Sequence, residues 1–292
     1  MQVIIVTGGN YGIGKGISIG LSRRGHRVVS FGLDTRQPGS LAENGIADLQ
    51  SEARDLGLQL DVLDADVSRA ADVSRVVEFT LQKYGRVDAL VNNAAIGPLG
   101  TILETSEELW DQIIDVNLKG MYLCCRAVLP HMIRQGGGSI VNIGSGAGWG
   151  KPNMLAYAAS KGGVFALSVA LAYDHFSDHI RVNTVVPGGG GIMTGMSLGR
   201  VGGDLQRLNR GASGTVAGRS ATPADVESAV AFLLSDEAAV ISGAVLDVGC
   251  FSHQGGPIPS KTAGQSARRE SEAGTAERRG SDVPEAPRRS KG

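Results

Sequence analysis

The sequence has few cysteines, few aromatic residues and almost no net charge. Its 292 residues include three cysteines, and aromatic residues make up 4% of the chain. Three cysteines cannot form a disulfide framework, and they show no CxxC or Cys/His spacing of the kind that zinc sites use, so we expect no metal. A formal net charge of −1 gives no electrostatic reason to expect a nucleic-acid partner.

Long apolar runs are scarce as well. We find no run that approaches the length needed to span a bilayer, and we expect no membrane segment. The chain reaches the apolar run VIIV at residues 3–6 without a basic region and a cleavage site, so we expect no signal peptide. Together with cysteines that we expect to be reduced, these features favour a cytoplasmic protein.

Short β-branched runs alternate with helical patterns along most of the chain. The runs are nearly continuous in apolar residues, which is typical of strands buried on both faces of a parallel sheet. The predicted strands are 3–6, 27–31, 60–63, 87–91, 139–143, 180–185 and 244–248. The predicted helices are 13–24, 40–56, 70–84, 106–134, 156–176 and 223–235. This alternation predicts one doubly wound α/β domain with a mainly parallel, seven-stranded sheet.

The pattern stops near residue 252. Residues 253–292 are rich in Gly, Pro, Ser, Ala, Arg and Glu and contain no aromatic residue. Such a segment cannot bury enough apolar surface to offset the entropy of ordering it, so we predict a domain at 1–252 and a disordered polar tail at 253–292. Its paired arginines either contact an anionic partner or are simply solvated, and we favour the second reading.

The first predicted strand runs into the glycine-rich segment TGGNYGIG at residues 7–14. Gly8, Gly12 and Gly14 would make a tight turn from strand to helix and let the backbone approach a pyrophosphate at the helix N-terminus. The alternative is a glycine turn without a ligand. The position of this turn, after a buried strand and before an amphipathic helix, favours binding of a dinucleotide.

Polar residues follow the next three predicted strands, where open α/β sheets bind ligands. Asp34 would hydrogen-bond the 2′-hydroxyl of an adenosine ribose and repel a 2′-phosphate, whereas Arg36 would do the reverse, so the choice between NAD and NADP stays open. Asp66 follows the third strand, and NNAA at 92–95 follows the fourth. Asp66 could equally cap a helix, and Asn92 could be a turn residue.

Tyr157 and Lys161 share a helical face because they are four residues apart. Taken alone, such a pair is ordinary. A free tyrosine has a pKa of about 10 and is a poor base near neutrality, but an ammonium group one helical turn away favours the phenolate and lowers that pKa. A catalytic pair would also need a nicotinamide, a hydroxyl group to share the substrate oxygen and a path for the proton.

Taken in order, the motifs resemble those of the short-chain dehydrogenase/reductase family over residues 1 to about 250. The matching segments are TGGNYGIG (7–14), ADV (65–67), NNAA (92–95), DVNLKG (115–120), SIVNIGSGAG (139–148), YAASK (157–161) and RVNTVVPG (181–188). The resemblance implies a Rossmann-type domain that binds NAD or NADP and assembles as a dimer or tetramer. It also implies hydride transfer between the nicotinamide and the carbinol or carbonyl carbon of a small alcohol or ketone.

The resemblance implies a role for each matching residue. Tyr157 would be the general acid/base, Lys161 would lower its pKa and bind the nicotinamide ribose, and Ser145 would hold the substrate oxygen. Asn117 would bind a water that links Lys161 to solvent. The implied cofactor-binding residues are Gly8, Asn10, Tyr11, Gly12, Ile13, Gly14, Asp34, Asp66, Val67, Asn93, Ala94, Tyr157, Lys161, Pro187 and Gly188.

The sequence departs from the family's pattern at four places. Gly32 stands where NAD-preferring relatives carry an acid, and Ala95 replaces the glycine of NNAG. The step from Pro187-Gly188 to Thr194 is longer than usual, which leaves the nicotinamide and phosphate contacts of that segment open. The closing Asp-Gly-Gly of many relatives is replaced by Gly249-Cys250-Phe251, which weakens the prediction of an oligomer.

The substrate is expected to lie among residues 97–105, 146–155 and 189–215. Apolar residues there either line a pocket or pack the loops: Trp149, Met154, Met193 and Met196. Three arginines either attract an anionic substrate or are solvated: Arg200, Arg207 and Arg210. An alcohol dehydrogenase or carbonyl reductase is the first interpretation, and a 3-oxoacyl thioester reductase acting on an acyl carrier is the second. The other classes considered are a catalytically silent regulatory protein and an interaction protein that works through the tail.

Overall fold

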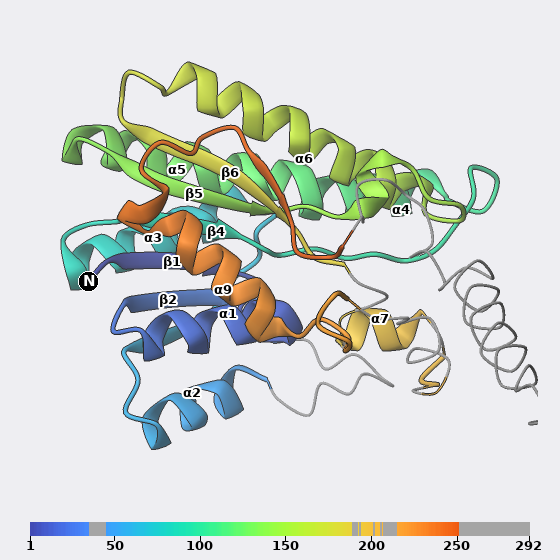
Figure 1. Ribbon diagram of the computed structural model, residues 1–292, viewed down its shortest axis with the longest axis horizontal. Coiled ribbons are helices and arrows are strands. Elements are labelled where there is room, and N and C mark those ends of the chain that lie inside the picture. Colours follow the sequence, from blue (N-terminus) through green and yellow to red (C-terminus); the bar gives the residue numbers. More distant parts are fainter. Residues whose placement is uncertain are drawn as a thin grey trace, which may run out of the picture. The chain divides into compact units, whose positions relative to one another are not determined.

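Seven parallel strands form the centre of the molecule (Figure 1). The computed structural model describes residues 1–34, 45–188, 192, 194–200, 202–204, 206 and 215–250. The strands are β1 (Val3–Thr7), β2 (Arg27–Gly32), β3 (Leu60–Asp64), β4 (Ala89–Asn92), β5 (Gly138–Ile143), β6 (Ile180–Val186) and β7 (Val245–Asp247). Their order across the sheet is β3-β2-β1-β4-β5-β6-β7, and every neighbouring pair is parallel. All seven predicted strands are confirmed.

The chain reverses its direction of winding between β1 and β4. From β1 it moves outward to β2 and β3, and it then returns to the other side of β1 to add β4 through β7. Ligands of open α/β sheets bind at the carboxyl ends of the strands beside such a switch point. The motifs of the sequence therefore meet at one edge of the sheet.

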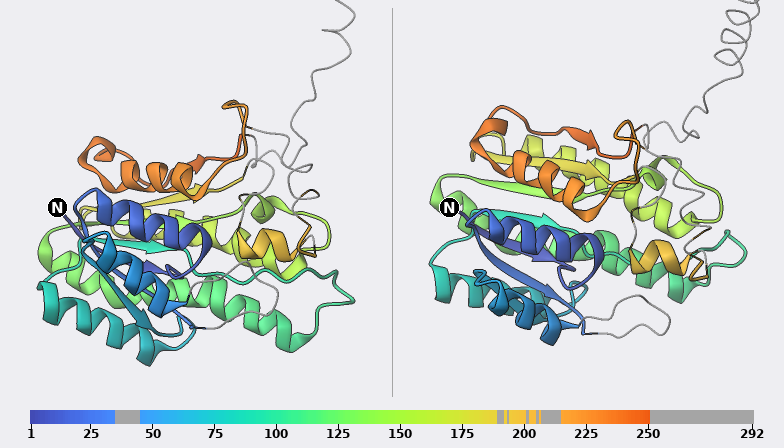
Figure 2. Two further views of the ribbon diagram at one scale, coloured as in Figure 1. Left: turned by 90° about the horizontal axis from the view of Figure 1, so that it is seen from below. Right: turned by 60° about the horizontal axis from the view of Figure 1, so that its bottom comes forward.

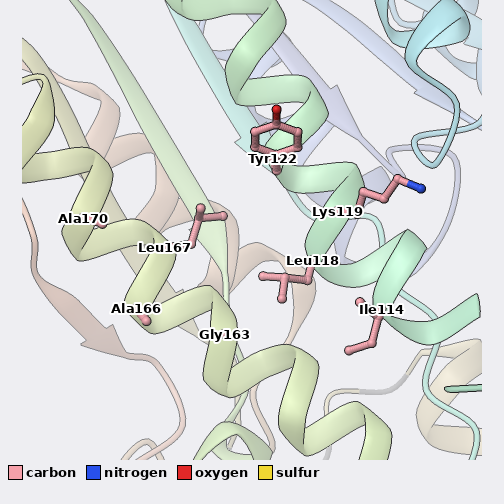
Figure 3. Close-up of a pocket in the computed structure, with 8 residues that line it drawn as sticks. All are labelled: Ile114, Leu118, Lys119, Tyr122, Gly163, Ala166, Leu167 and Ala170. Carbon is pink, nitrogen blue, oxygen red and sulfur yellow. The ribbon is translucent and has the colours of Figure 1, made fainter. Parts of the chain in front are cut away.

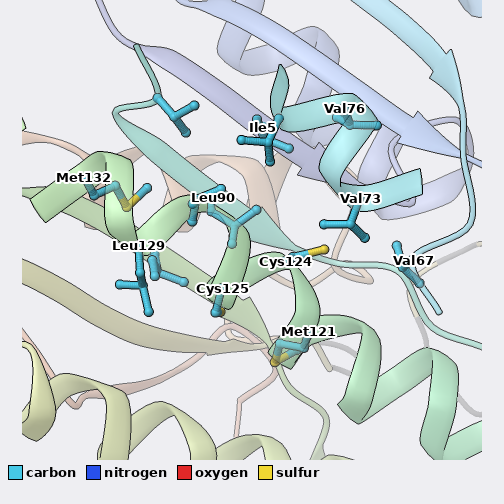
Figure 4. Close-up of a cluster of buried hydrophobic side chains, with 14 of the residues drawn as sticks. Ile5, Val67, Val73, Val76, Leu90, Met121, Cys124, Cys125, Leu129 and Met132 are labelled. Carbon is cyan, nitrogen blue, oxygen red and sulfur yellow. The ribbon is translucent and has the colours of Figure 1, made fainter. Parts of the chain in front are cut away.

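Helices cover both faces of the sheet (Figure 2). One face carries α3 (Ala70–Tyr84), α5 (Gly120–Gln135) and α6 (Leu155–Asp174), and the other carries α1 (Gly12–Arg23), α2 (Ile46–Asp55) and α9 (Pro223–Leu234). Figure 4 shows the larger core cluster, where Ile5 and Leu90 of the sheet meet Val73 of α3 and Met121 of α5. Burial on both faces explains why the central strands are continuous apolar runs, whereas the edge strands β3 and β7 are partly exposed.

Cys124 and Cys125 lie inside this core cluster, on α5 (Figure 4). Both are free thiols, and burial raises the pKa of Cys125 to about 12. Burial also raises the pKa of Cys124 well above its ordinary value. Because the thiolate is the reactive form, these two cysteines act as small apolar core residues.

Two glycines let α1 and α9 pack closely, and these helices lie side by side in Figures 1 and 2. A Cβ atom on Gly16 would lie 2.5 Å from Cβ of Pro223, and one on Gly20 would lie 2.4 Å from Cγ of Glu227. Thr222 and Asp225 cap the first turn of α9 reciprocally, which confirms the predicted helix start. The helix α9 therefore supports α1, which begins at the glycine-rich turn.

The helix predicted over 106–134 is unbroken from Glu107 to Gln135, but it is not α-helical throughout. It consists of α4 (Glu107–Ile114), a π-helical turn η1 (Asp115–Lys119) and α5. A short helix, α7 (Gly195–Gly199), lies in a segment for which the sequence predicts no helix. The first residues of the helix predicted at 40–56 and the whole tail at 253–292 lie outside the described residues. The domain boundary at residue 252 therefore stays a prediction.

One helix corrects the expectation about apolar stretches. The 20 residues of α6 have a mean hydropathy of 1.4 over their most apolar window, which by length and composition is enough to cross a membrane. The core helix of a doubly wound domain has the same character, and α6 packs on the sheet through buried residues that include Val164 and Ser168. No other helix in the described part of the chain has this length and composition.

Candidate active site

The predicted site residues gather at the carboxyl edge of the sheet. Each follows directly on a strand or lies on a helix that begins at this edge. The turn at 7–14 follows β1, Asp34 follows β2, Asp66 and Val67 follow β3, Asn93 and Ala94 follow β4, Ser145 follows β5, and Pro187 and Gly188 follow β6. Asn117 lies in η1, and Tyr157 and Lys161 lie in the first half of α6.

The turn between β1 and α1 requires its glycines. Gly8 and Gly12 have φ values of +62° and +52°, in the left-handed region that favours glycine. A Cβ atom on Gly14 would lie 2.1 Å from the carbonyl oxygen of Gly8, which leaves no room for a side chain. The first turn of α1 also carries no acidic residue. The turn thus presents bare backbone at the positive end of a helix, which suits a phosphate group.

Thr7 and Asn93 fasten this turn to the segment that follows β4. The Thr7 hydroxyl accepts hydrogen bonds from the backbone N–H groups of Asn93 and Ala94, at 3.0 and 2.9 Å. The Asn93 amide donates to the carbonyl oxygens of Thr7 and Gly8, at 3.1 and 3.0 Å. The side chain of Asn93 therefore holds the turn in place. No local sequence pattern indicates the role of Thr7, because its partner is 86 residues away.

Asn10 is buried in this turn with both polar atoms of its side chain unpaired among the described residues. A Cβ atom on Gly32, at the end of β2, would lie 3.2 Å from the Asn10 amide nitrogen. Buried amide groups normally have hydrogen-bond partners. An unpaired amide beside the end of β2 suits the ribose of a dinucleotide.

The two acids predicted to read the adenosine make local hydrogen bonds. The Asp34 carboxylate accepts a hydrogen bond of 3.0 Å from the N–H of Ile46, which opens α2. The Asp66 carboxylate accepts from the N–H and the hydroxyl of Ser68, at 2.8 and 2.7 Å. Asp66 therefore forms a local turn with Ser68 and does not cap α3, whose N-cap residue is Arg69. Arg36 lies outside the described residues.

Tyr157 and Lys161 are both buried on the inner face of α6. The Lys161 Nζ atom donates to the carbonyl oxygen of Ile143, at the end of β5, over 2.7 Å. The same atom lies 5.9 Å from the centroid of the Tyr157 ring. The cation is therefore fixed by the sheet at a set place beside the tyrosine.

Two pKa values are shifted at this pair. Burial acts to raise the pKa of Tyr157, but the charge of Lys161, a hydrogen bond from Ser145 and the charge of Arg200 outweigh it, so that the pKa lies below its ordinary value. Burial lowers the pKa of Lys161, and the neighbouring Tyr157 opposes that change. The tyrosine is thereby suited to exchange a proton nearer to neutral pH.

Ser145 begins the 3-10 turn η2 (Gly146–Trp149) directly after β5. Its hydroxyl accepts a hydrogen bond of 3.2 Å from the N–H of Ala147 and interacts with the hydroxyl of Tyr157. A substrate oxygen held by both hydroxyl groups would lie at the same edge of the sheet as the glycine-rich turn.

Asn117 lies at the middle of η1 and is fully buried. Its side chain exchanges two hydrogen bonds with the backbone of Ile96, at 2.8 and 2.9 Å, and donates to Ser160 over 3.1 Å. Ser160 in turn donates to the backbone carbonyl of Tyr157 over 2.8 Å. The amide thus joins η1 to the turn of α6 that carries the tyrosine.

A family model described as Enoyl-(Acyl carrier protein) reductase matches residues 8–250. A probable short-chain type dehydrogenase/reductase from Bradyrhizobium diazoefficiens is 39% identical over 280 residues, which are 94% of this chain and 94% of that protein. The chain belongs to the short-chain dehydrogenase/reductase family.

Two further members of the family are similar to the chain over most of their length. The 2-(S)-hydroxypropyl-CoM dehydrogenase 3 of Xanthobacter autotrophicus is 38% identical over 251 residues, 85% of this chain and 94% of that protein. The crystal structure of an actinorhodin polyketide ketoreductase with NADPH has a TM-score of 0.76 at 30% identity, and the match covers 86% of this chain and 97% of that chain. The chain is an NAD(P)-dependent oxidoreductase of the short-chain family that acts on CH–OH groups.

The departures from the family's pattern do not remove the features that suit a dinucleotide. Despite the longer step after Gly188, Thr194 reaches the glycine-rich turn, since a Cβ atom on Gly12 would lie 3.3 Å from Cβ of Thr194. Thr194 also caps α7 through Ser197. The bare turn and the unpaired amide of Asn10 both fit the cofactor of the short-chain family. No cluster of three or more His, Cys, Asp or Glu that could hold a metal ion occurs in the described ranges.

Proposed function

We propose that Asn117, Ser145, Tyr157 and Lys161 form the catalytic tetrad of a dehydrogenase or reductase for a small alcohol or ketone. The observation that carries this proposal is the lowered pKa of Tyr157, a buried tyrosine beside a buried cation and a serine hydroxyl. The bound nicotinamide supplies or accepts the hydride. The four side chains place the substrate oxygen and move its proton.

Tyr157 is the general acid/base of this scheme. In ketone reduction its hydroxyl donates a proton to the carbonyl oxygen as the hydride reaches the carbon, and in alcohol oxidation its phenolate accepts the proton. Lys161 stabilises the phenolate and, by similarity to the family, binds the nicotinamide ribose. Ser145 donates a hydrogen bond to the substrate oxygen and holds it against Tyr157.

Asn117 has two roles in the proposal. By similarity to the family it binds a water that links Lys161 to solvent and completes a proton relay. Its bond to Ser160 also supports a positioning role, because Ser160 is bonded to the backbone of Tyr157. The proposed cofactor-binding residues are the bare turn Gly8 to Gly14 with Asn10 and Tyr11, together with Asp34, Asp66, Val67, Asn93, Ala94, Tyr157, Lys161, Pro187 and Gly188.

A spectrophotometric screen at the nicotinamide absorbance tests this function. The protein is mixed with NAD(H) or NADP(H) and a panel of secondary alcohols and ketones. We expect turnover of at least one alcohol–ketone couple, with one cofactor preferred. Tight cofactor binding without turnover of any couple would contradict the proposal and favour a regulatory protein that has lost catalysis.

A reductase for 3-oxoacyl thioesters is the second candidate. It uses the same tetrad, and the similarity to a polyketide ketoreductase supports it. The two candidates differ in what they recognise beyond the ketone. A ratio of kcat/KM that strongly favours a 3-oxoacyl thioester over the free ketone of the same chain length would support the thioester reductase.

We also propose that the chain assembles with copies of itself through α5 and α6, as a dimer or a tetramer. A groove of about 580 Å³ between α6 and the helical stretch formed by α4, η1 and α5 is lined mainly by apolar side chains (Figure 3). Ile114, Leu118 and Tyr122 line one side of it, and Ala166 and Ala170 of α6 line the other. A second copy of this apolar face would cover it. The buried, free thiols support a cytoplasmic setting, where cysteines stay reduced.

A further inference from the structure

Arg200 lies against the tyrosine of the proposed tetrad. It follows α7 directly, and its Cζ atom is 4.9 Å from the centroid of the Tyr157 ring. Its Nε atom donates to the carbonyl oxygen of Gly97 over 3.2 Å. One of the two interpretations of Arg200 from the sequence is a solvated side chain, but in the structure its guanidinium lies beside Tyr157.

One nitrogen of this guanidinium lacks a partner. The Nη2 atom of Arg200 is buried and makes no hydrogen bond with the described residues. A buried donor that belongs to a charged group is costly to leave unpaired. Among the described residues this cationic donor is left available beside Tyr157, where a ligand could accept its hydrogen bond.

Arg200 also lacks a carboxylate partner in the described part of the chain. The ion pairs found there join other residues. The nearest acid along the chain is Asp204, four residues after Arg200, and none of these ion pairs joins the two residues. An arginine that only stabilised the loop would be expected to pair with an acid, as Arg24 does with Glu227.

Gly97 makes room for this cation. A Cβ atom on Gly97 would lie 2.3 Å from Arg200 Nη2 and 3.2 Å from Cδ2 of Tyr157. Any side chain at residue 97 would therefore push the guanidinium away from the tyrosine. The bare backbone lets the cationic donor and the tyrosine border the same space.

We propose that Arg200 binds an oxyanion of the substrate, so that the site takes small ketones and secondary alcohols that carry a carboxylate or a similar anionic group near the reacting carbon. The assignment rests on the proposed function, because Tyr157 defines where the carbonyl oxygen lies. The planar guanidinium can present two N–H groups to two oxygens of one anion, which a lysine cannot do.

Arg200 could instead act only by lowering the pKa of Tyr157. The two roles differ in what they predict for neutral substrates. A residue that acts on Tyr157 alone changes turnover of charged and neutral ketones by the same factor. A residue that binds the oxyanion changes the affinity for the charged ketone and leaves that for the neutral one almost unaltered.

The test uses two matched pairs of ligands, acetoacetate with methyl acetoacetate and 2-oxopropylphosphonate with its dimethyl ester. Each pair has the same ketone with and without the charge. Affinities are measured by isothermal titration on the cofactor-loaded Tyr157→Phe protein, in which the proposed proton donor is absent, and again after adding Arg200→Gln or Arg200→Lys. Arg86→Gln serves as the control, because Arg86 pairs with Asp88 before the amino end of β4.

We expect at least one anion to bind about 10- to 100-fold more tightly than its neutral ester, the range for hydrogen bonds to charged groups. Arg200→Gln should abolish that preference, Arg200→Lys should restore part of it, and Arg86→Gln should leave it intact. Equal affinities within both pairs, or a preference that survives Arg200→Gln, would overturn the assignment. Because these titrations need no turnover, they stand apart from the activity screen that tests the proposed function.

Discussion

The proposed reactivity of Tyr157 depends on neighbouring groups whose effect on its pKa outweighs the effect of burial. Burial alone disfavours a phenolate, yet Lys161, Ser145 and Arg200 together bring the pKa below its ordinary value. Lys161 is itself buried, and its ammonium group is held by the carbonyl oxygen of Ile143. The tyrosine and the lysine thus depend on each other for their charged forms.

Lys161→Met tests this dependence through the pH profile of alcohol oxidation. Oxidation requires the phenolate, so kcat/KM rises as the pH increases through the pKa of Tyr157. Removing the ammonium group raises that pKa, so we expect the rise to move to higher pH and turnover at neutral pH to fall by about 10²-fold or more. Lys83→Met, which alters a lysine paired with Asp61, is the control and should keep the wild-type profile. An unchanged profile in Lys161→Met would contradict the account.

Residue roles differ in how far the sequence could reveal them. Tyr157 and Lys161 are one helical turn apart, so their pairing follows from spacing alone. The contact of Arg200 with Tyr157 joins residues far apart in the chain through a glycine-rich loop, and no local pattern encodes it. The link between Thr7 and the segment after β4 was hidden for the same reason.

At the scale of elements, the turn between β1 and α1 was predictable from its glycines. Their spacing after a strand indicates both a backbone without side chains and the start of a helix. The π-helical turn η1 was not predictable. The segment DVNLK contains no Pro or Gly and reads as ordinary helix. Its extra residue per turn places Asn117 between Ile96 and Ser160, and those contacts are made by distant parts of the chain.

Gly14→Ala tests the tight packing of the glycine-rich turn. The new Cβ atom would meet the carbonyl oxygen of Gly8, so we expect the free energy of unfolding to fall by about 1–3 kcal/mol. We also expect cofactor affinity, measured by nicotinamide fluorescence, to fall at least about tenfold, because the displaced backbone no longer fits a pyrophosphate.

Gly199→Ala is the matched control for that change. A Cβ atom on Gly199 meets nothing within 4 Å, and alanine is the better helix former, so stability should stay equal or rise by up to about 1 kcal/mol. Cofactor affinity should be unchanged. If Gly14→Ala left both stability and cofactor affinity unchanged, as expected for Gly199→Ala, the turn would tolerate a side chain and this account of it would be wrong.

At the scale of the whole molecule, strand–helix alternation predicted the doubly wound fold and all seven strands. The order of the strands came from the structure, since alternation does not say on which side of β1 the fourth strand adds. That order is what brings the motifs after β1, β4, β5 and β6 to one edge of the sheet. Local motifs supply the residues of the site, and the strand order brings those residues together.

The apolar face of α5 and α6 gives a prediction about assembly. Ala170 is exposed on this face, and Ala170→Arg places a charge where a second copy would pack. We expect the wild-type protein to be a dimer or tetramer by light scattering after gel filtration, and the variant to dissociate at equal concentration. Ala71→Arg, at an exposed position of α3, should not change the mass of the assembly. A monomeric wild-type protein, or an unaffected variant, would refute this interface.

The central claim is that the Tyr157 hydroxyl transfers the proton, whereas most of the affinity for the cofactor comes from the other residues of its site. Tyr157→Phe removes one hydroxyl from a buried ring and leaves the glycine-rich turn untouched. On a substrate found in the activity screen, we expect turnover to fall by about 10²- to 10⁴-fold or more, while the dissociation constant of the nicotinamide cofactor changes less than about threefold. Turnover close to that of the wild-type protein, at unchanged cofactor affinity, would contradict the account.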